Sequence, residues 1–182
     1  MGTNRKVVYV EFGYHTAREE WEEVGLPAYE RFKLSPTRAT AMEVAIHAWH
    51  AQDWLWHEVN PGVDTHSNPA FAAFRKQLIA DCQELEWVGD IADAAKHRGL
   101  GRPKPPQVER MNLAQEPKLL LWSNGRLALT TNGKGILVGG RPLTIELTDG
   151  SKHEVAQVLE RVVEFWQARF AATLARHPEQ TD

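Results

Sequence analysis

The sequence predicts an α+β protein that is mainly α-helical, with a four-helix bundle followed by a small antiparallel β-sheet and a long C-terminal helix. Helix start and stop signals recur over residues 16–99, between apolar residues at helical spacing. Residues 118–150 instead contain short apolar runs separated by Asn-Gly and Asp-Gly pairs, which are typical of β-turns. From residue 151 to about residue 175, apolar residues again recur at helical spacing, which predicts the last helix.

The composition is that of a globular protein that needs no covalent staple. The chain has 182 residues, of which 42% are apolar and 25% are charged, and its net charge is −3. A chain of this length and composition buries a core without a disulfide or a structural metal. Cys82 is its single cysteine, which excludes an internal disulfide and a thiolate zinc site within one chain and favours a cytoplasmic location. No apolar run approaches the roughly 18 residues of a transmembrane helix, so we expect no membrane partner.

Helix signals divide the first part of the chain. Gly25 and Pro27 interrupt the first helical pattern and predict a kink or two shorter helices. Ser35 and Asn68 each precede a proline, an arrangement that favours a capped helix start. The four helices are expected over residues 17–34, 36–59, 69–79 and 84–97.

A change of composition divides the chain further. Residues 101–117 are rich in proline and predict a linker. Residues 1–100 would then form the helical bundle, and residues 118–182 would form the small sheet and the last helix, packed with the bundle as one compact unit.

The longest helix carries an unusual polar set. With about 100° per residue, Met42, Ile46 and Trp49 form an apolar stripe, and His50, Asp53 and His57 fall in its middle. Asp53 follows His50 by three residues and precedes His57 by four, so both imidazoles can reach the carboxylate. An unpaired carboxylate on a buried face is costly, so the set requires a physical reason.

Three explanations of His50, Asp53 and His57 stay open. The first is a structural cluster in which the carboxylate binds the imidazoles and fixes how the helix docks. The second is a site for a divalent metal, in which these three side chains and a ligand from another helix bind the ion, since no other cofactor is expected. The third is metal-free acid–base chemistry, with an imidazole oriented by Asp53 as the base.

The fourth helix carries a second polar set. Asp90, Asp93 and His97 share the side opposite to its apolar residues. Acids early in a helix and bases late in it are what the helix dipole favours on a solvated face. The functional alternative is that this side meets the side with His50, Asp53 and His57 across a groove.

A basic stretch follows directly. Residues 94–108 contain no acid but hold Lys96, Arg98, Arg102 and Lys104. This local positive charge in a slightly acidic protein predicts a patch, over residues 96–104, that receives a phosphate or a nucleic-acid backbone.

Two segments carry a family resemblance. They are Ala-Gln-Asp-Trp-Leu-Trp-His at 51–57 and Asp-Ile-Ala-Asp-Ala-Ala-Lys-His at 90–97. Over about residues 40–100 the chain resembles a group of uncharacterised bacterial and phage helical proteins, which carry an Asp-Trp helix followed by a helix that ends in Lys-His. The resemblance implies a layout similar to that of HEPN-type bundles, which often act as RNA-cleaving toxins or defence effectors. HEPN nucleases use an arginine followed, after four to six residues, by a histidine, and this sequence has no such pair.

Two functions from different classes follow. In the first, the protein is an interaction or scaffold module that presents a basic or aromatic surface to another protein or to a second copy of itself. In the second, it is a hydrolase directed at phosphates or nucleic acid, metal-dependent or not. Its site would combine six residues: His50, Asp53, His57, Asp90, Asp93 and His97.

Overall fold

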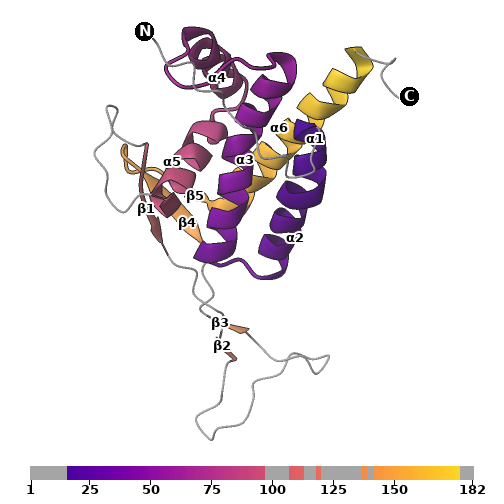
Figure 1. The fold of residues 1–182 in the computed structure, drawn as a ribbon. Helices are drawn as coiled ribbons and strands as arrows, with labels where there is room; N and C mark the ends of the chain where they lie inside the picture. The colour runs from indigo at the N-terminus through magenta and orange to yellow at the C-terminus, as the bar shows by residue number, and fades with distance from the viewer. Residues whose placement is uncertain (1–15, 97–106, 113–117, 120–136, 139–141, 177–182) are drawn as a thin grey trace, which may run out of the picture.

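A computed structural model describes residues 16–96, 107–112, 118–119, 137–138 and 142–176 of the chain. The described part is mainly helical, with a small antiparallel sheet and a long last helix, as the sequence predicts (Figure 1). The helices are α1 (Ala17–Glu20), the π-helix η1 (Trp21–Gly25), α2 (Leu26–Leu34), α3 (Arg38–Val59), α4 (Pro69–Asp81), α5 (Glu84–Lys96) and α6 (Val155–Arg176). The strands are β1 (Val108–Asn112), β2 (Lys118–Leu119), β3 (Leu137–Val138), β4 (Thr144–Leu147) and β5 (Lys152–Glu154).

The first helical stretch begins with a capping box formed by Thr16 and Glu19. Thr16 accepts a hydrogen bond from the backbone N–H of Glu19 at 3.0 Å, and the Glu19 carboxylate accepts one from the backbone N–H of Thr16 at 3.1 Å. This reciprocal capping box satisfies two N–H groups that the first turn leaves without a partner. At the expected interruption the helix does not break: it widens into the π-helix η1 and continues as α2, with Pro27 in its first turn.

The next two helix starts differ in how well the sequence locates them. Asn68 caps α4 through its side-chain oxygen, as predicted. The predicted cap of α3 at Ser35 is wrong, because Thr37 is the cap and its hydroxyl accepts from the backbone N–H of Thr40. The hydroxyl of Thr40 also donates to the backbone carbonyl of Ser35. Because Ser35 is the C-terminal cap of α2, this hydrogen bond helps to fix the turn between α2 and α3.

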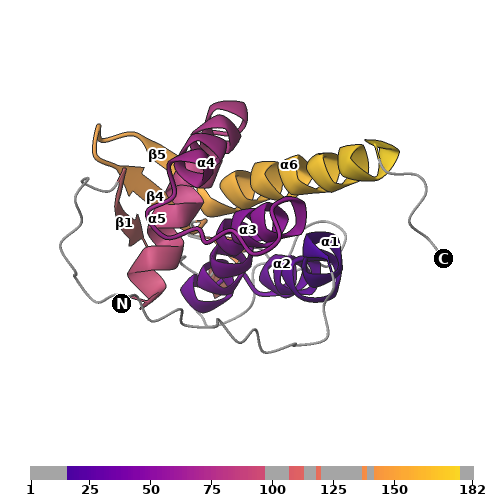
Figure 2. The same ribbon diagram turned by 45° about the horizontal axis from the view of Figure 1, so that its top comes forward.

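The long helix α3 lies at the centre of the molecule. It packs against α1, η1, α2, α5 and α6 (Figures 1 and 2). Trp166 of α6 is fully buried, and its Nε1 donates to the backbone carbonyl of Ala48 in α3 at 2.9 Å. The finer prediction of a four-helix bundle is not confirmed, because the last helix completes the packing around α3.

The sheet has the strand order β1-β4-β5, and both pairs of strands are antiparallel. Ile145 and Leu147 of β4 and Leu143, which directly precedes the strand, are buried at alternate positions and join the same core cluster as the helices. Gly150, with a φ of 84°, turns the chain from β4 into β5 in a conformation that glycine adopts without strain. The short strands β2 and β3 form a separate antiparallel pair.

Strand β1 lies within the stretch that the sequence predicts as a linker. It is an edge strand, and its register shifts between Val108 and Arg110, which is a β-bulge. Bulges at sheet edges bend the strand and limit its pairing with other chains. None of the described helices combines the length and the apolar character that crossing a bilayer requires.

Candidate functional site

The most deeply buried side of α3 is not the side of Met42, Ile46 and Trp49 that the sequence pattern predicts. Five small residues on it have 0% exposure: Ala41, Val44, Ala45, Ala48 and Ala51. The larger Gln52 and Leu55 on the same side are 1% and 4% exposed. At about 100° per residue, this side lies opposite the stripe of Met42, Ile46 and Trp49, whose side chains are only partly buried. The prediction that His50, Asp53 and His57 occupy the middle of the core-facing side is therefore wrong.

His50 and Asp53 nevertheless form a pair. The Nδ1 of His50 lies 2.9 Å from Oδ2 of Asp53, which is one helical turn away. The two side chains are 35% and 32% exposed, so the pair lies at the surface of the helix array and water reaches it. His57, one turn further along, is half-buried on the same helix. A carboxylate that orients an imidazole at the surface serves either to fix the local structure or to make the imidazole a base.

Helix α4 carries an arginine, Arg75, whose charge interacts with that of Asp53 and which no sequence pattern singles out. The guanidinium of Arg75 lies 4.4 Å from the centre of the Trp49 ring and 5.6 Å from that of Phe71. Burial lowers the pKa of Arg75, and the charges of Asp53 on α3 and Asp93 on α5 oppose that shift. Both carboxylates therefore act on one half-buried cation, and we call these residues (His50, Asp53, Arg75 and Asp93) the junction cluster.

The Trp49 ring closes the contact between α3 and α5. A Cβ atom at Gly89 would lie 2.7 Å from the Cζ3 atom of this ring, which is closer than real contacts allow. Glycine at position 89 thus lets the ring lie on the backbone of α5. A signal for this arrangement is present in the sequence, since a glycine within a helical pattern indicates a close approach by another group.

Asp90 has a different neighbour. Its Oδ2 accepts hydrogen bonds from the backbone N–H groups of Gln107 at 2.6 Å and Val108 at 3.0 Å. Asp90 therefore anchors the first residues of β1 to α5. Of the residues predicted on α5, Asp93 acts together with Asp53 on the charge of Arg75. Asp90 instead accepts hydrogen bonds from the backbone at the start of the sheet.

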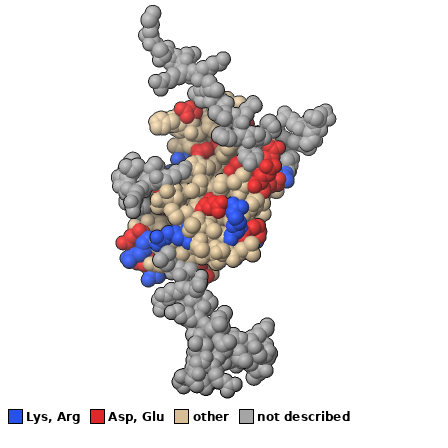
Figure 3. All heavy atoms as spheres, turned by 60° about the horizontal axis from the view of Figure 1, so that its bottom comes forward, with Lys and Arg blue, Asp and Glu red and all other residues tan. Residues whose placement is uncertain are grey.

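Several predicted residues lie beyond this description. His97, Arg98, Arg102 and Lys104 are outside the described residues, and for Lys96 only the backbone is described. On the face of the described part shown in Figure 3, acidic and basic side chains are interspersed and no field of one sign extends across it. The phosphate or nucleic-acid patch over residues 96–104 stays a prediction.

A second histidine–carboxylate pair is more buried than the predicted one. Glu20 of α1 is 6% exposed, and its Oε1 lies 3.0 Å from Nδ1 of His47 on α3. Nearby, the carboxylate of Glu58 accepts a hydrogen bond from the backbone N–H of Ala17 at 2.8 Å. These contacts attach α1 to both halves of α3, and sequence spacing could not reveal them because their partners are 27 and 41 residues apart.

The described residues offer no ready metal site. Within them, no three histidine, cysteine, aspartate or glutamate side chains are grouped so that they could hold an ion. Cys82 is also a poor nucleophile, since burial raises the pKa of its thiol to about 11 and the thiol is the less reactive form at neutral pH.

A cleft of about 370 Å³ lies between α3, α5 and β1. We call it the α3–α5–β1 groove. Its floor is apolar, with Met42, Ile91, Val108 and Met111 among the residues that line it. Arg38 crosses one end, where its guanidinium donates to the backbone carbonyl of Met111 at 3.0 Å.

Comparison of the chain with protein-family models, with curated proteins and with solved structures finds no match. The resemblance to bacterial and phage helical proteins is therefore a prediction from the two short segments alone.

Proposed function

We propose that this protein is an interaction module with no catalytic activity, in which the junction cluster is structural and the α3–α5–β1 groove receives a segment of another protein. One observation carries the proposal: the described carboxylates that the sequence offers for catalysis are engaged by groups of the fold. Asp53 lies against His50 and beside Arg75, and Asp90 binds two backbone N–H groups. A carboxylate that itself acts as the general base or as a metal ligand must instead be free to meet its substrate or ion.

The groove has the features of a docking surface. Two methionines line it, and methionine side chains adapt to different partner shapes. Arg38, Glu109 and Arg110 supply charges of both signs at its edges, as at the polar rim of a protein–protein interface. The edge strand beside it is partly blocked, because Asp90 and Arg38 occupy backbone groups of residues 107, 108 and 111. We therefore expect side-chain contacts in the groove to provide most of the binding free energy.

Photo-crosslinking in cells tests the location of the docking surface. Benzoylphenylalanine at the exposed position Ala94, which lines the groove, should give a discrete adduct that mass spectrometry identifies as one protein or as a second copy of this chain. The same group at the exposed position Ala72 of α4 serves as the control. Absence of an adduct at Ala94, or equal yields at the two positions, would contradict the proposal.

A phosphate-directed hydrolase is the second candidate, and the exposed His50–Asp53 pair favours it. An imidazole that is oriented by a carboxylate and accessible to water is the arrangement of a general base. Hydrolysis of bis(p-nitrophenyl) phosphate by the purified chain, lost in both His50→Ala and Asp53→Asn, would replace the first proposal with this one. Repetition with a chelator and with added divalent ions distinguishes the metal-dependent form.

A further inference from the structure

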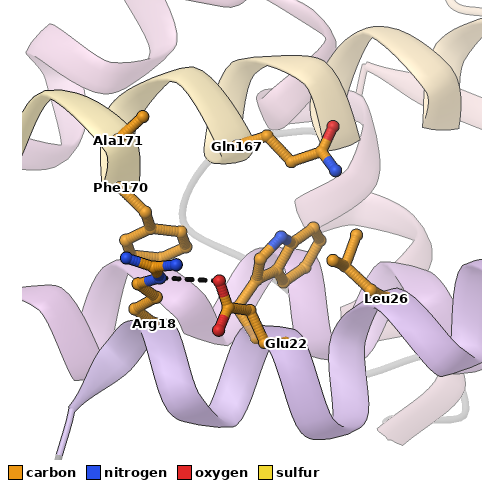
Figure 4. Close-up of a pocket in the computed structure, with 7 residues that line it drawn as sticks. Arg18, Glu22, Leu26, Gln167, Phe170 and Ala171 are labelled. Atoms are coloured by element: carbon orange, nitrogen blue, oxygen red, sulfur yellow. Dashed lines mark hydrogen bonds and ion pairs between the residues drawn. The ribbon is translucent and has the colours of Figure 1, made fainter.

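Two hollows in the described part of the chain each have an arginine at the rim, and the two arginines differ in their partners. One hollow, of about 260 Å³, lies between the N-terminal helical stretch and α6 (Figure 4). There the Nε of Arg18 lies 2.6 Å from the Glu22 carboxylate, so this cation already has its counter-ion. The other hollow is the α3–α5–β1 groove, with Arg38 at its end.

Arg38 is a positioned cation without a counter-ion in the described part of the protein. Its one polar contact there is the hydrogen bond from Nη2 to the backbone carbonyl of Met111 at 3.0 Å. A guanidinium carries five N–H donors, so four are left for another partner. The side chain is exposed, and a ligand in the groove can reach it. The bond to Met111 therefore fixes where the charge lies and does not neutralise it.

The other charged residues that line the groove are already engaged by the fold. Asp90 accepts two backbone N–H groups at the start of β1. Glu109 lies 3.9 Å from Arg110, and Arg110 lies 3.4 Å from Glu146 on the neighbouring strand. Arg38 therefore decides the sign of the charge that the groove offers to a ligand, and that sign favours an anionic group.

The floor of the groove sets a second requirement. Met42, Ile91, Val108 and Met111 make it apolar, and Ile91 is only 3% exposed. An engineered apolar cavity of about 150 Å³ holds a benzene molecule. A groove of about 370 Å³ thus accommodates one large apolar side chain together with part of the next residue. An apolar floor suits such a side chain better than a nucleic-acid backbone, which is charged at every residue.

We propose that the segment bound in the α3–α5–β1 groove carries an aspartate or glutamate beside a large apolar residue. The apolar side chain lies on the methionine-containing floor, and the carboxylate accepts hydrogen bonds from the Arg38 guanidinium, which binds a carboxylate through two parallel N–H···O bonds. This inference rests on the proposed function, because it names the chemistry of the partner that the groove receives.

Nuclear magnetic resonance of the full chain with ¹³C-labelled methionine methyl groups tests the proposal. The chain has three methionines, and Met42→Leu and Met111→Leu assign the two signals from the groove. The probes are three tetrapeptides, acetylated and amidated at their ends: Asp-Leu-Phe-Asp, Asn-Leu-Phe-Asn and Lys-Leu-Phe-Lys. The Asp peptide should shift both signals in a saturable way. The Asn peptide should bind about fivefold more weakly, as expected for loss of an exposed ion pair, and the Lys peptide more weakly still.

Charge reversal at Arg38 provides the matched test. Arg38→Glu should reverse the order, so that the Lys peptide binds more tightly than the Asp peptide. Arg38→Gln should bind the Asp and Asn peptides equally. Lys76→Glu, at an exposed position of α4 that does not line the groove, changes the net charge by the same amount as Arg38→Glu and should leave the order unchanged.

The outcomes separate this inference from the proposed function. Equal binding of the three peptides at Met42 and Met111 overturns the inference and leaves the docking surface in place. The inference is also overturned if the Lys peptide binds most tightly to the natural sequence, if Lys76→Glu reverses the order, or if no peptide shifts the two signals. In that last case the cross-link at Ala94 decides separately whether the groove receives a protein.

A dinucleotide probe tests the competing class of partner. If uridylyl-(3′→5′)-uridine shifts the Met42 and Met111 signals at a lower concentration than the Asp peptide, the proposal of an acidic protein segment is overturned in favour of a nucleic-acid phosphate. The comparison of the probes on the natural sequence remains decisive should Arg38→Glu fail to fold.

Discussion

The two sides of α3 bury side chains of very different size. One side presents alanines and a valine that are completely buried against the neighbouring helices. The other carries the larger residues Met42, Ile46 and Trp49, which stay partly exposed, and the His50–Asp53 pair. Burial thus follows how closely the neighbours approach and not how apolar the side chain is, because a small side chain admits another helix to close contact.

The largest effect on the free energy of unfolding is expected when a larger side chain replaces a buried alanine of α3. Ala48→Leu should lower the free energy of unfolding by about 3 kcal/mol, because added methylene groups in a close-packed interface force neighbours out of position. The Ala48 carbonyl also accepts the bond from Trp166, so displacement of α6 would break it. On the other side, Ile46→Ala should cost about 1.5 kcal/mol, since its side chain is only partly buried.

Urea denaturation measures both changes, and Ala70→Leu at an exposed position of α4 is the control for the substitution itself. A larger loss for Ile46→Ala than for Ala48→Leu would reverse the comparison between the two sides.

The next largest effect on stability is expected at Asp90, whose carboxylate binds the backbone at the start of β1. Asp90→Ala should cost about 2 kcal/mol, because hydrogen bonds to a charged acceptor are stronger than neutral ones and two N–H groups lose their partner. Hydrogen exchange of the Gln107 and Val108 amides should accelerate as well. Asp93→Ala should leave the exchange of these two amides unchanged, and protection that survives Asp90→Ala would show that another acceptor holds β1.

The local elements of this fold are largely predictable from the sequence. The capping box at Thr16, the Asn68 cap and the end of α3 before Pro61 depend on neighbouring residues, and the structure contains all three. Strand β1 was not predicted, since its residues Val-Glu-Arg-Met-Asn show no alternation and follow a run of prolines. Its stability comes from β4, Asp90 and Arg38, which are distant in sequence.

The candidate site is predictable only in part for the same reason. The His50–Asp53 pair follows from a spacing of three residues on one helix, and the structure contains it. The sequence predicts the wrong inward-facing side of α3, because alanine is only weakly apolar and contributes little to an apolar pattern. Four alanines in fact mark the buried side. The sequence does not single out Arg75, because its role depends on how α4 packs beside Trp49, and no local sequence pattern encodes that packing.

A gain in stability is expected at Gln52, the one buried polar residue of α3. Gln52 is 1% exposed, and neither atom of its side-chain amide has a partner among the described residues. Gln52→Met retains the shape and removes the unpaired groups, so the free energy of unfolding should rise by about 1 kcal/mol. Gln77→Met, at an exposed position of α4, should have little effect. A loss of stability in Gln52→Met would indicate that a buried water bonds this amide in solution.

The smallest effect is expected where the sequence first drew attention. If His50 and Asp53 were buried, removal of the carboxylate would leave an unpaired imidazole in the core and cost several kcal/mol. At about one-third exposure, water solvates what the substitution uncovers, so Asp53→Ala should cost only about 0.5 kcal/mol. The loss should shrink further in 1 M salt, since an exposed pair is screened within about 3 Å at that concentration. A cost above about 2 kcal/mol, unchanged by salt, would show that Asp53 stabilises the contact between the helices mainly through half-buried Arg75. Substitutions on the two sides of α3 would then have similar effects on the free energy of unfolding.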